Sequence, residues 1–204
     1  GRSETAEVIF GFDTADDGNL FFEGQEVAFT NPKQAISMGI GLVPEDRKEQ
    51  GLVLGMSCDD NMGLPSLPRM QHFGLVNSKM QDQLFQEYAA KLAISTPGPK
   101  QKVGKLSGGN QQKIVIGKWI ALNPKLLILD EPTRGIDVGS KSEIHKLIDD
   151  MANDGIAVLV ISSEMPEIIG VSDRILTMRE GHITDEFFRD DVTEEKLLQA
   201  CAQE

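Results

Sequence analysis

Residues 126–132 read Leu-Leu-Ile-Leu-Asp-Glu-Pro, four apolar residues followed by two acids and a proline. A continuous apolar run of this length is typical of a strand that is buried on both faces of a parallel sheet. Ligands bind at the carboxyl ends of such strands. We therefore expect Asp130 to hold a hydrated Mg²⁺ and Glu131 to face a water molecule beside a phosphate. The alternative is a buried strand that simply ends in surface acids.

The same alternation of strand and helix continues on both sides of this run. Apolar runs at 40–43 and 156–161 predict further buried strands, and amphipathic helices are expected at 108–122 and 139–153. Continuous apolar strands that alternate with amphipathic helices indicate an α/β fold, with a parallel sheet covered on both faces.

Two segments outside this alternation have a different character. Short apolar stretches at 20–22 and 27–29 predict a small antiparallel hairpin with its turn at Glu23-Gly24. Residues 46–105 begin with a stretch rich in Gly, Pro, Met and Ser and then become amphipathic, which predicts an inserted, mostly helical lobe. One buried helical stripe is expected in this lobe, formed by Met80, Leu84, Tyr88 and Leu92.

Residues 106–113 read Leu-Ser-Gly-Gly-Asn-Gln-Gln-Lys and lead into a predicted helix. Ser107 is a good N-cap residue for that helix. Gly108 and Gly109 expose bare backbone N–H groups at the positive end of the helix dipole, a combination that binds phosphate oxygens. The alternative is a flexible Gly-Gly linker ahead of a helix. The whole octapeptide is a specific pattern, which favours phosphate binding.

Composition and charge exclude several classes of protein. The chain has 204 residues, of which 40% are hydrophobic, so a core of useful size is expected and global disorder is excluded. Its 20 Lys and Arg residues against 32 Asp and Glu residues give a net charge of −12, which argues against a nucleic-acid partner. No apolar run approaches the roughly 20 residues that span a bilayer. Cys58 and Cys201 lack metal-ligand spacing, which favours two structural thiols in a reducing compartment.

Three motifs resemble, in order and spacing, the signature loop, the Walker B strand and the D-loop of an ATP-binding-cassette (ABC) transporter's nucleotide-binding domain. They are Leu106-Ser-Gly-Gly-Asn-Gln-Gln112, Leu127-Ile-Leu-Asp-Glu-Pro132 and Gly135-Ile-Asp137. The resemblance covers the whole chain and implies a P-loop NTPase (RecA-like) fold. It would divide residues 1–204 into a core, 1–45 and 106–204, and a helical subdomain, 46–105.

Longer motifs narrow this resemblance to the second cassette of the tandem ATPases of bacterial monosaccharide importers, of the ribose, galactose, xylose and autoinducer-2 types. The motifs are Val43-Pro-Glu-Asp-Arg47, Asp130-Glu-Pro-Thr-Arg-Gly-Ile-Asp-Val-Gly139 and Ser162-Ser-Glu-Met-Pro-Glu167. The resemblance implies an ATPase that uses ATP and Mg²⁺ to drive sugar uptake at the cytoplasmic face of the membrane. It implies a second cassette, fused upstream or separate, membrane permease subunits and, indirectly, a periplasmic or extracellular sugar-binding protein. The helical lobe would contact the permease, with Gly55-Met56 and Asn61-Met62 as either docking surface or lobe core.

The resemblance also assigns roles to individual residues. The chain begins with Gly1-Arg2-Ser3, which resembles the ending of a P-loop with Arg in place of Lys, so the strand and glycines of that loop are expected upstream. Ser3 and Asp130 would hold the metal, and the catalytic positions would be Asp130, Glu131, Ser163 and Glu45. The nucleotide contacts would be Gly1, Arg2, Ser3, Ser107, Gly108, Gly109, Gln111 and Asp137.

Three of these positions depart from the family pattern. Arg2 keeps the charge of the P-loop lysine but is a wide planar fork rather than a compact point donor. Glu45 stands where such cassettes place a Gln, and Ser163 where they place a switch His, while His145 and His182 are interpreted as solvated side chains. We therefore expect a degenerate ATP site in this chain and a signature loop that completes a partner's site.

Two other functions stay open at this point. A soluble ABC ATPase outside transport would carry basic arms or long coiled-coil insertions, and the sequence shows neither. A regulatory domain that has lost nucleotide binding is mildly disfavoured by Asp130 and Glu131.

Overall fold

A three-stranded parallel sheet forms the centre of the molecule. The computed structural model describes residues 1–72 and 74–202. The sheet has the order β3-β6-β7. Its strands are β3, Ile40–Val43; β6, Leu126–Asp130; and β7, Ala157–Ile161. Both pairings are parallel, and Asp130 lies opposite Ile161. The α/β fold predicted from the apolar runs is confirmed.

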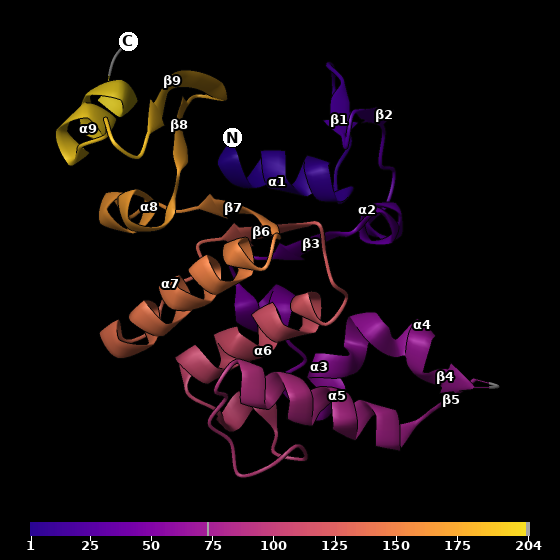
Figure 1. The fold of residues 1–204 in the computed structure, drawn as a ribbon. Helices are drawn as coiled ribbons and strands as arrows, with labels where there is room; N and C mark the ends of the chain where they lie inside the picture. Colours follow the sequence, from indigo (N-terminus) through magenta and orange to yellow (C-terminus); the bar gives the residue numbers. More distant parts are fainter. Residues whose placement is uncertain (73, 203–204) are drawn as a thin grey trace.

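Helices cover both faces of this sheet, as Figure 1 shows, with α1 on one side and α6 and α7 on the other. They are α1, Arg2–Phe10; α2, Pro32–Met38; α6, Gly108–Ile120; and α7, Val138–Asn153. Phe10 of α1 and Trp119 of α6 meet edge to face, with ring centroids 5.5 Å apart. Aromatic pairs in this geometry stabilise a fold by more than the area that they bury, so this pair helps to hold α1 against α6.

The core is most complete around β6 and α6. Leu127, Ile128 and Leu129 of β6 are fully buried, as expected for the middle strand of a covered parallel sheet. Helix α6 is buried on nearly all sides, because it packs against β3 and also against α3, α5 and α7. A helix that is buried on all sides lies in the interior of the protein. Helix α6 therefore connects the sheet to the helical lobe.

The elements between β3 and α6 form a mostly helical lobe, which lies below the sheet in Figure 1. Its elements are a π-helical turn, Arg47–Gly51; α3, Cys58–Gly63; a 3₁₀ turn, Leu64–Ser66; α4, Leu67–Met70; β4, Gln71–His72; β5, Leu75–Val76; α5, Ser78–Lys91; and a 3₁₀ turn, Val103–Lys105. The lobe is mostly helical, and the β4–β5 hairpin is an addition that the sequence pattern did not predict.

Three residues of the stripe predicted on α5 face the core as expected, because Tyr88 and Leu92 are buried and Leu84 packs against the core, but Met80 does not. Met80 is 43% exposed, and Gln81, Phe85 and Tyr88 are the buried residues of the helix. The Gln81 side chain donates a hydrogen bond of 2.8 Å to the Asp60 carboxylate of α3. A count of apolar residues alone misses this polar contact near the start of the helix.

Two antiparallel hairpins stand at the ends of the chain. The first pairs β1, Leu20–Phe22, with β2, Gln25–Val27, and its turn residues Glu23 and Gly24 both have left-handed backbone. The second hairpin follows α8 and precedes α9. These C-terminal elements are α8, Met165–Val171; β8, Arg174–Arg179; β9, His182–Phe188; and α9, Glu194–Ala202.

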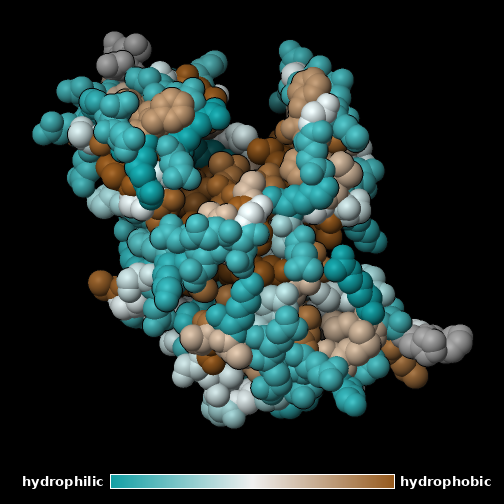
Figure 2. Space-filling view, viewed as in Figure 1, coloured by the Kyte–Doolittle hydropathy of each residue, from teal (hydrophilic) through white to brown (hydrophobic). Residues whose placement is uncertain are grey.

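Strand β7 forms one edge of the sheet within the described residues. Leu159 in its middle is 37% exposed, although it belongs to a continuous apolar run. Figure 2 shows apolar surface in the notch between the two hairpin arms, above the sheet. Within residues 1–72 and 74–202, none of the helices has the length and apolar character needed to cross a membrane.

Lys118 is a buried cation in the central helix α6. It is 7% exposed, its ammonium donates to the Gly51 carbonyl at the end of the π-helical turn, and it lies 5.7 Å from the Trp119 ring centroid. Burial lowers the pKa of Lys118 to about 8. The lysine therefore links α6 to the lobe, and its ammonium group is poorly solvated.

We predict a pH-dependent stability from Lys118. Between about pH 8 and the unfolded value of about 10.4, the unfolded chain binds more protons at this group than the folded chain, so the free energy of unfolding rises with pH. Across this window, the free energy of unfolding measured in urea should rise by about 3 kcal/mol more for the wild type than for Lys118→Met. The exposed control Lys146→Met should follow the wild type, and parallel pH curves for Lys118→Met and wild type would contradict the assignment.

Candidate functional site

Asp130 lies at the carboxyl end of the central strand β6. It is 5% exposed, and its Oδ1 atom is buried without a hydrogen-bond partner among the described residues. Burial raises the pKa of the Asp130 carboxyl, and a hydrogen bond with Ser3 and the positive charge of Arg2 oppose that rise. Helix α1 thus brings Ser3 and Arg2 to Asp130.

These oxygen donors suit a hard cation that keeps most of its water. Mg²⁺ takes one or two carboxylates together with waters and substrate phosphates. No group of three or more His, Cys, Asp or Glu side chains in the described part of the chain could hold a metal ion. The unpartnered Asp130 oxygen and the Ser3 hydroxyl therefore fit Mg²⁺ shared with a phosphate, rather than a cation in an all-protein cage.

Glu131 follows with an unusual backbone conformation. Its φ of +46° is left-handed, which is strained for a residue with a side chain. The Glu131 N–H donates to the Ile161 carbonyl at 2.8 Å, and its own carbonyl accepts from the Arg134 N–H at 3.1 Å. These two bonds hold Glu131 in a turn at the carboxyl edge of the sheet. Strain of this kind is concentrated at functional sites, which agrees with the predicted role of Glu131.

Arg2 is engaged by the loop after β7. Its Nη1 donates a hydrogen bond of 2.8 Å to the Ser162 carbonyl, and the next residue, Ser163, is exposed. The backbone at Gly1 is close to the β8–β9 turn, because a Cβ on Gly1 would lie 2.9 Å from the Met178 sulfur. Part of the hydrogen-bonding capacity of the Arg2 guanidinium is therefore already used within the protein.

A buried carboxylate supports this loop from below. Glu167 of α8 is 4% exposed and accepts a hydrogen bond of 2.5 Å from the Ser162 hydroxyl. The His145 Nε2 atom lies 2.9 Å from the other Glu167 oxygen. The interpretation of His145 as a solvated surface residue is wrong, because α7 turns it onto this buried acid.

The signature loop, Ser107–Gly109, sits at the start of α6. Ser107 caps the helix, its hydroxyl accepts from the Asn110 side chain at 2.8 Å, and the residue is exposed. Both glycines are crowded: a Cβ on Gly108 would lie 2.9 Å from a guanidinium nitrogen of Arg47, and a Cβ on Gly109 would collide with Ser140. The glycines therefore allow two neighbouring segments to pack directly against the loop backbone.

Gln111 supports the loop from within. It is 5% exposed, and its Nε2 donates to the carbonyls of Val103 and Leu106, both at 3.3 Å. The structure places this side chain beneath the loop rather than on its outer face. Its expected role as a direct nucleotide contact is not supported by this position.

Glu45 and Asp137 both have partners. Glu45 forms an ion pair with Arg134, so a cation neutralises the acid that stands in place of the expected Gln. Asp137 caps α7 and accepts from the Ser140 N–H at 2.9 Å and the Ser140 hydroxyl at 2.8 Å. The hydrogen bond from the Ser140 N–H holds the pKa of Asp137 below its usual value.

The predicted residues thus fall into two groups on one connected surface. The first lies at the carboxyl edge of the sheet and contains Gly1, Arg2, Ser3, Asp130, Glu131 and Ser163. The second lies around the start of α6 and contains Ser107, Gly108, Gly109 and Asp137. The segment from Glu131 to Asp137 joins the groups, and Glu45 contacts it through Arg134.

Sequence reasoning missed Arg47 as a member of the second group. Arg47 donates to the carbonyls of Arg134 and Gly135. In the sequence, Arg47 is the last residue of the motif Val43-Pro-Glu-Asp-Arg47. A charged residue after a strand carries no signal of its partner, since the partner is a backbone carbonyl 87 residues away.

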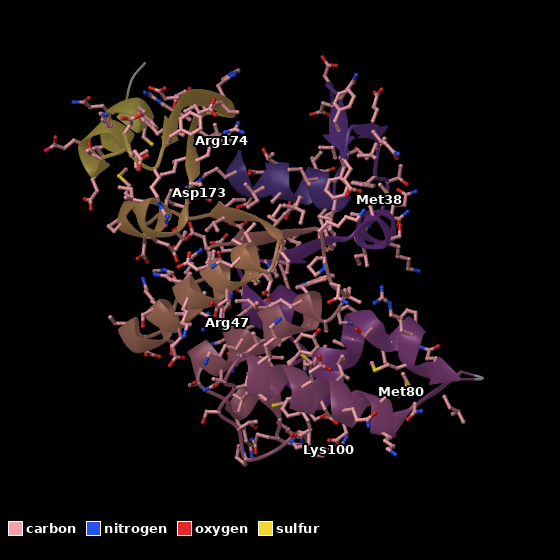
Figure 3. The ribbon with its side chains drawn as sticks, in the orientation of Figure 1. Met38, Arg47, Met80, Lys100, Asp173 and Arg174 are labelled. Carbon is pink, nitrogen blue, oxygen red and sulfur yellow. The ribbon has the colours of Figure 1, made fainter. Side chains whose placement is uncertain are left out.

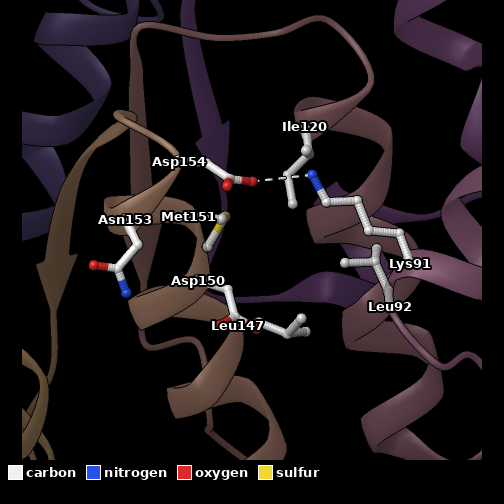
Figure 4. Close-up of a pocket in the computed structure, with 8 residues that line it drawn as sticks. All are labelled: Lys91, Leu92, Ile120, Leu147, Asp150, Met151, Asn153 and Asp154. Carbon is white, nitrogen blue, oxygen red and sulfur yellow. Dashed lines mark hydrogen bonds and ion pairs between the residues drawn. The ribbon is translucent and has the colours of Figure 1, made fainter.

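A separate hollow of about 260 Å³ lies between the lobe and the core. Figure 4 shows its mouth, where Lys91 of α5 pairs with Asp154 at 3.1 Å. Leu92, Ile120 and Met151 line its inner wall. Both charges of the pair are about half exposed, so the pair contributes at most about 1 kcal/mol.

Comparisons with known proteins agree with this arrangement. Residues 1–134 match the family described as ABC transporter. A ribose import ATP-binding protein of Halalkalibacterium halodurans is 46% identical over 198 residues, which cover 97% of this chain and 40% of that protein. One of Rhodopirellula baltica is 46% identical over 202 residues, with 98% and 40% covered. The chain spans about two fifths of the length of these relatives.

Solved structures share the fold. A nucleotide-free ATP-binding cassette from an ABC transporter has a TM-score of 0.80 at 23% identity, covering 100% of this chain and 84% of that chain. An ATP-binding cassette of an ABC transporter in an ADP conformation has a TM-score of 0.76 at 25% identity, covering 98% and 78%.

We predict that Asp130→Asn stabilises the ligand-free chain at pH 7. The substitution removes a buried, partly unpaired charge, and we expect the free energy of unfolding to rise by roughly 1–3 kcal/mol. Since the folded carboxyl has a raised pKa, the difference should shrink as the pH falls through that pKa and level off below the unfolded value of about 3.9, where the wild-type carboxyl is protonated in both states.

Urea unfolding of the two proteins tests this prediction, with exposed Asp149→Asn as the control. A loss of stability in Asp130→Asn would mean that the carboxylate makes stronger contacts than the structure shows.

Proposed function

This chain belongs to the ABC transporter family, and from that membership we propose that it is an ATP-binding cassette of a sugar importer. It would couple the binding and hydrolysis of ATP to monosaccharide uptake. Support comes from relatives named as ribose import ATP-binding proteins. The chain matches only part of each relative, so the activity of the whole protein is part of the proposal.

We propose that this cassette completes the ATP site of a second cassette. The observation that carries this proposal is the form of the signature loop: Ser107 is exposed at the N-terminus of a helix that is 13 residues long. Backbone N–H groups at a helix N-terminus bind phosphate. Gly108 is partly exposed beside Ser107, whereas Gly109 is buried against Ser140, so a facing γ-phosphate would approach the start of the helix at Ser107 and Gly108.

The chain's own site is proposed to be the weaker one. The Arg2 guanidinium donates to the Ser162 carbonyl, so part of the fork is not free for a phosphate. Ser163 offers a hydroxyl where a His would supply an imidazole. Glu45 adds a carboxylate beside the site, although Arg134 neutralises it. The features at Arg2 and Ser163 reduce the stabilisation of phosphate charge, on which phosphoryl transfer depends, and the ion-paired Glu45 supplies no amide in place of the Gln.

Mg²⁺ would be held by Ser3 and Asp130. When bound, the ion neutralises charge on the phosphate oxygens. The protein's own contribution is to keep the Asp130 carboxylate buried at the end of β6 and to hold Glu131 in its left-handed turn, where its carboxylate would orient the attacking water.

The partners follow from the same proposal. A membrane permease would dock on the helical lobe, where Val53 is 47% exposed and Leu54 is 37% exposed beside exposed Gly55. Asn61 and Met62 are fully buried and belong to the lobe core, not to this surface. The cassette would sit peripherally at the cytoplasmic face of the membrane, with a sugar-binding protein acting indirectly through the permease. The net charge of −12 argues against a nucleic-acid partner.

We predict that the isolated chain hydrolyses ATP poorly. With Mg²⁺ present, phosphate release should stay well below about 1 per second, the low end for ordinary enzymes. Arg2→Lys alone should not restore turnover, because Ser163 and Glu45 also differ and groups that act as a unit are not additive. A turnover of an ordinary enzyme in the isolated chain would show that its own site is competent.

We predict that, in the full-length protein, Gly108→Asp lowers ATPase turnover and sugar uptake by about a hundredfold or more. The added side chain would collide with the Arg47 guanidinium and the Gly135 carbonyl, so it would displace the loop backbone that is proposed to face the partner's γ-phosphate. Glu131→Gln acts in the weaker site and should leave most turnover intact. Gly98→Asp is the matched control, because a Cβ at Gly98 meets open space.

The reverse order of effects would refute the division of labour. If Glu131→Gln abolished turnover and Gly108→Asp kept it, this cassette would be the one that hydrolyses ATP.

A further inference from the structure

Arg47 lies where the helical lobe meets the core, as the label in Figure 3 shows. Its Nη1 donates to the Arg134 carbonyl at 2.7 Å, and its Nη2 donates to the Gly135 carbonyl at 3.1 Å. One guanidinium therefore binds two successive backbone carbonyls of the segment that precedes Asp137. The Gly135 backbone is left-handed, with φ +68°, so the bonded conformation is one that few residues adopt.

The same guanidinium also touches the signature loop. A Cβ on Gly108 would lie 2.9 Å from the Arg47 Nη2 atom and 3.3 Å from the Gly135 carbonyl oxygen. Gly108, Arg47 and Gly135 are therefore packed into one contact. The Arg47 Nε atom is buried and has no hydrogen-bond partner among the described residues, while the residue as a whole is partly exposed.

The backbone turn that carries Arg47 is also held by hydrogen bonds. The Asp46 carboxylate caps the π-helical turn by accepting from the N–H groups of Lys48 and Glu49, at 2.9 and 3.1 Å. At the other end of the turn, the Gly51 carbonyl accepts from buried Lys118. The turn that carries Arg47 is thus fixed to α6, the helix that the signature loop begins.

We propose that Arg47 is a positioning residue: it holds the signature loop and the Gly135–Asp137 segment together as one surface for the partner cassette's nucleotide. This inference rests on the proposed function of the signature loop and adds a residue to it. Arg47 does not itself touch the nucleotide in this role. A lysine at position 47 cannot replace it, because one ammonium is not a planar fork that reaches two carbonyls in fixed geometry.

The proposal predicts a distinctive kinetic change in the full-length protein. Arg47→Lys should lower kcat for ATP about tenfold while KM for ATP stays within about twofold, since the lost bonds position a surface and do not bind substrate. Arg47→Met should behave like Arg47→Lys. The matched control is Lys48→Met, which removes a neighbouring exposed charge from the same turn and should change kcat by less than about twofold.

Combining Arg47→Lys with Glu131→Gln separates an effect of Arg47 on the partner's site from an effect through Glu131. Arg47 acts on the partner's site in this proposal, so Arg47→Lys should cause the same tenfold loss when Glu131→Gln has already disabled the chain's own carboxylate. If the loss disappears in that background, Arg47 acts through Glu131 and the proposal is wrong. Hydrogen exchange gives a second readout: amides of residues 134–139 should exchange faster in Arg47→Lys but not in Lys48→Met. Unchanged exchange in Arg47→Lys would also overturn the proposal.

Gly108→Asp, measured in the same assay, distinguishes the two levels of the hypothesis. If Gly108→Asp is inactive and Arg47→Lys matches Lys48→Met, only the role of Arg47 fails. If Gly108→Asp retains full turnover, the proposed function of the signature loop fails, and the role of Arg47 fails with it.

Discussion

The parallel pairing of β6 with both β3 and β7 is the constraint on which the rest of the molecule depends. Leu127, Ile128 and Leu129 are fully buried and hydrogen-bonded on both sides, so β6 cannot shift without unfolding the core. Its last residue, Asp130, is thereby fixed opposite Ile161. The Glu131 N–H then bonds to the Ile161 carbonyl, and this bond starts the turn from which Arg134 and Gly135 reach the signature loop.

Close backbone approach governs the second half of the site. Gly108 and Gly109 have no side chains where Arg47 and Ser140 pack, and Asp137 caps α7 through Ser140. The surface around Ser107 is therefore built from backbone contacts that a single added methyl group would disturb. Such a preorganised surface suits charge stabilisation in phosphoryl transfer, because it does not have to reorganise during the reaction.

Much of this could be predicted from sequence, for reasons that differ between elements. The buried strands are continuous apolar runs, and Ser107 followed by two glycines indicates a capped, phosphate-binding helix start. The stripe predicted on α5 fails only at Met80, where the polar residue Gln81 is buried instead and bonds to Asp60. Strand β9 was not predicted, since it is mostly exposed and pairs with β8 through its backbone. Arg47 and the His145–Glu167 contact depend on residues brought together by the fold, and no spacing in the sequence reveals such pairs.

The most direct test of whether this cassette completes the ATP site of its partner uses ATP that carries a photoreactive group on its γ-phosphate. In the full-length protein, the label should attach to this cassette around Ser107–Gly109, and it should be lost when the partner's P-loop lysine is replaced. The isolated chain should show little labelling there. Labelling of the isolated chain at the same residues, or labelling confined to Gly1–Ser3 in the full-length protein, would contradict the proposal that this cassette serves its partner's nucleotide.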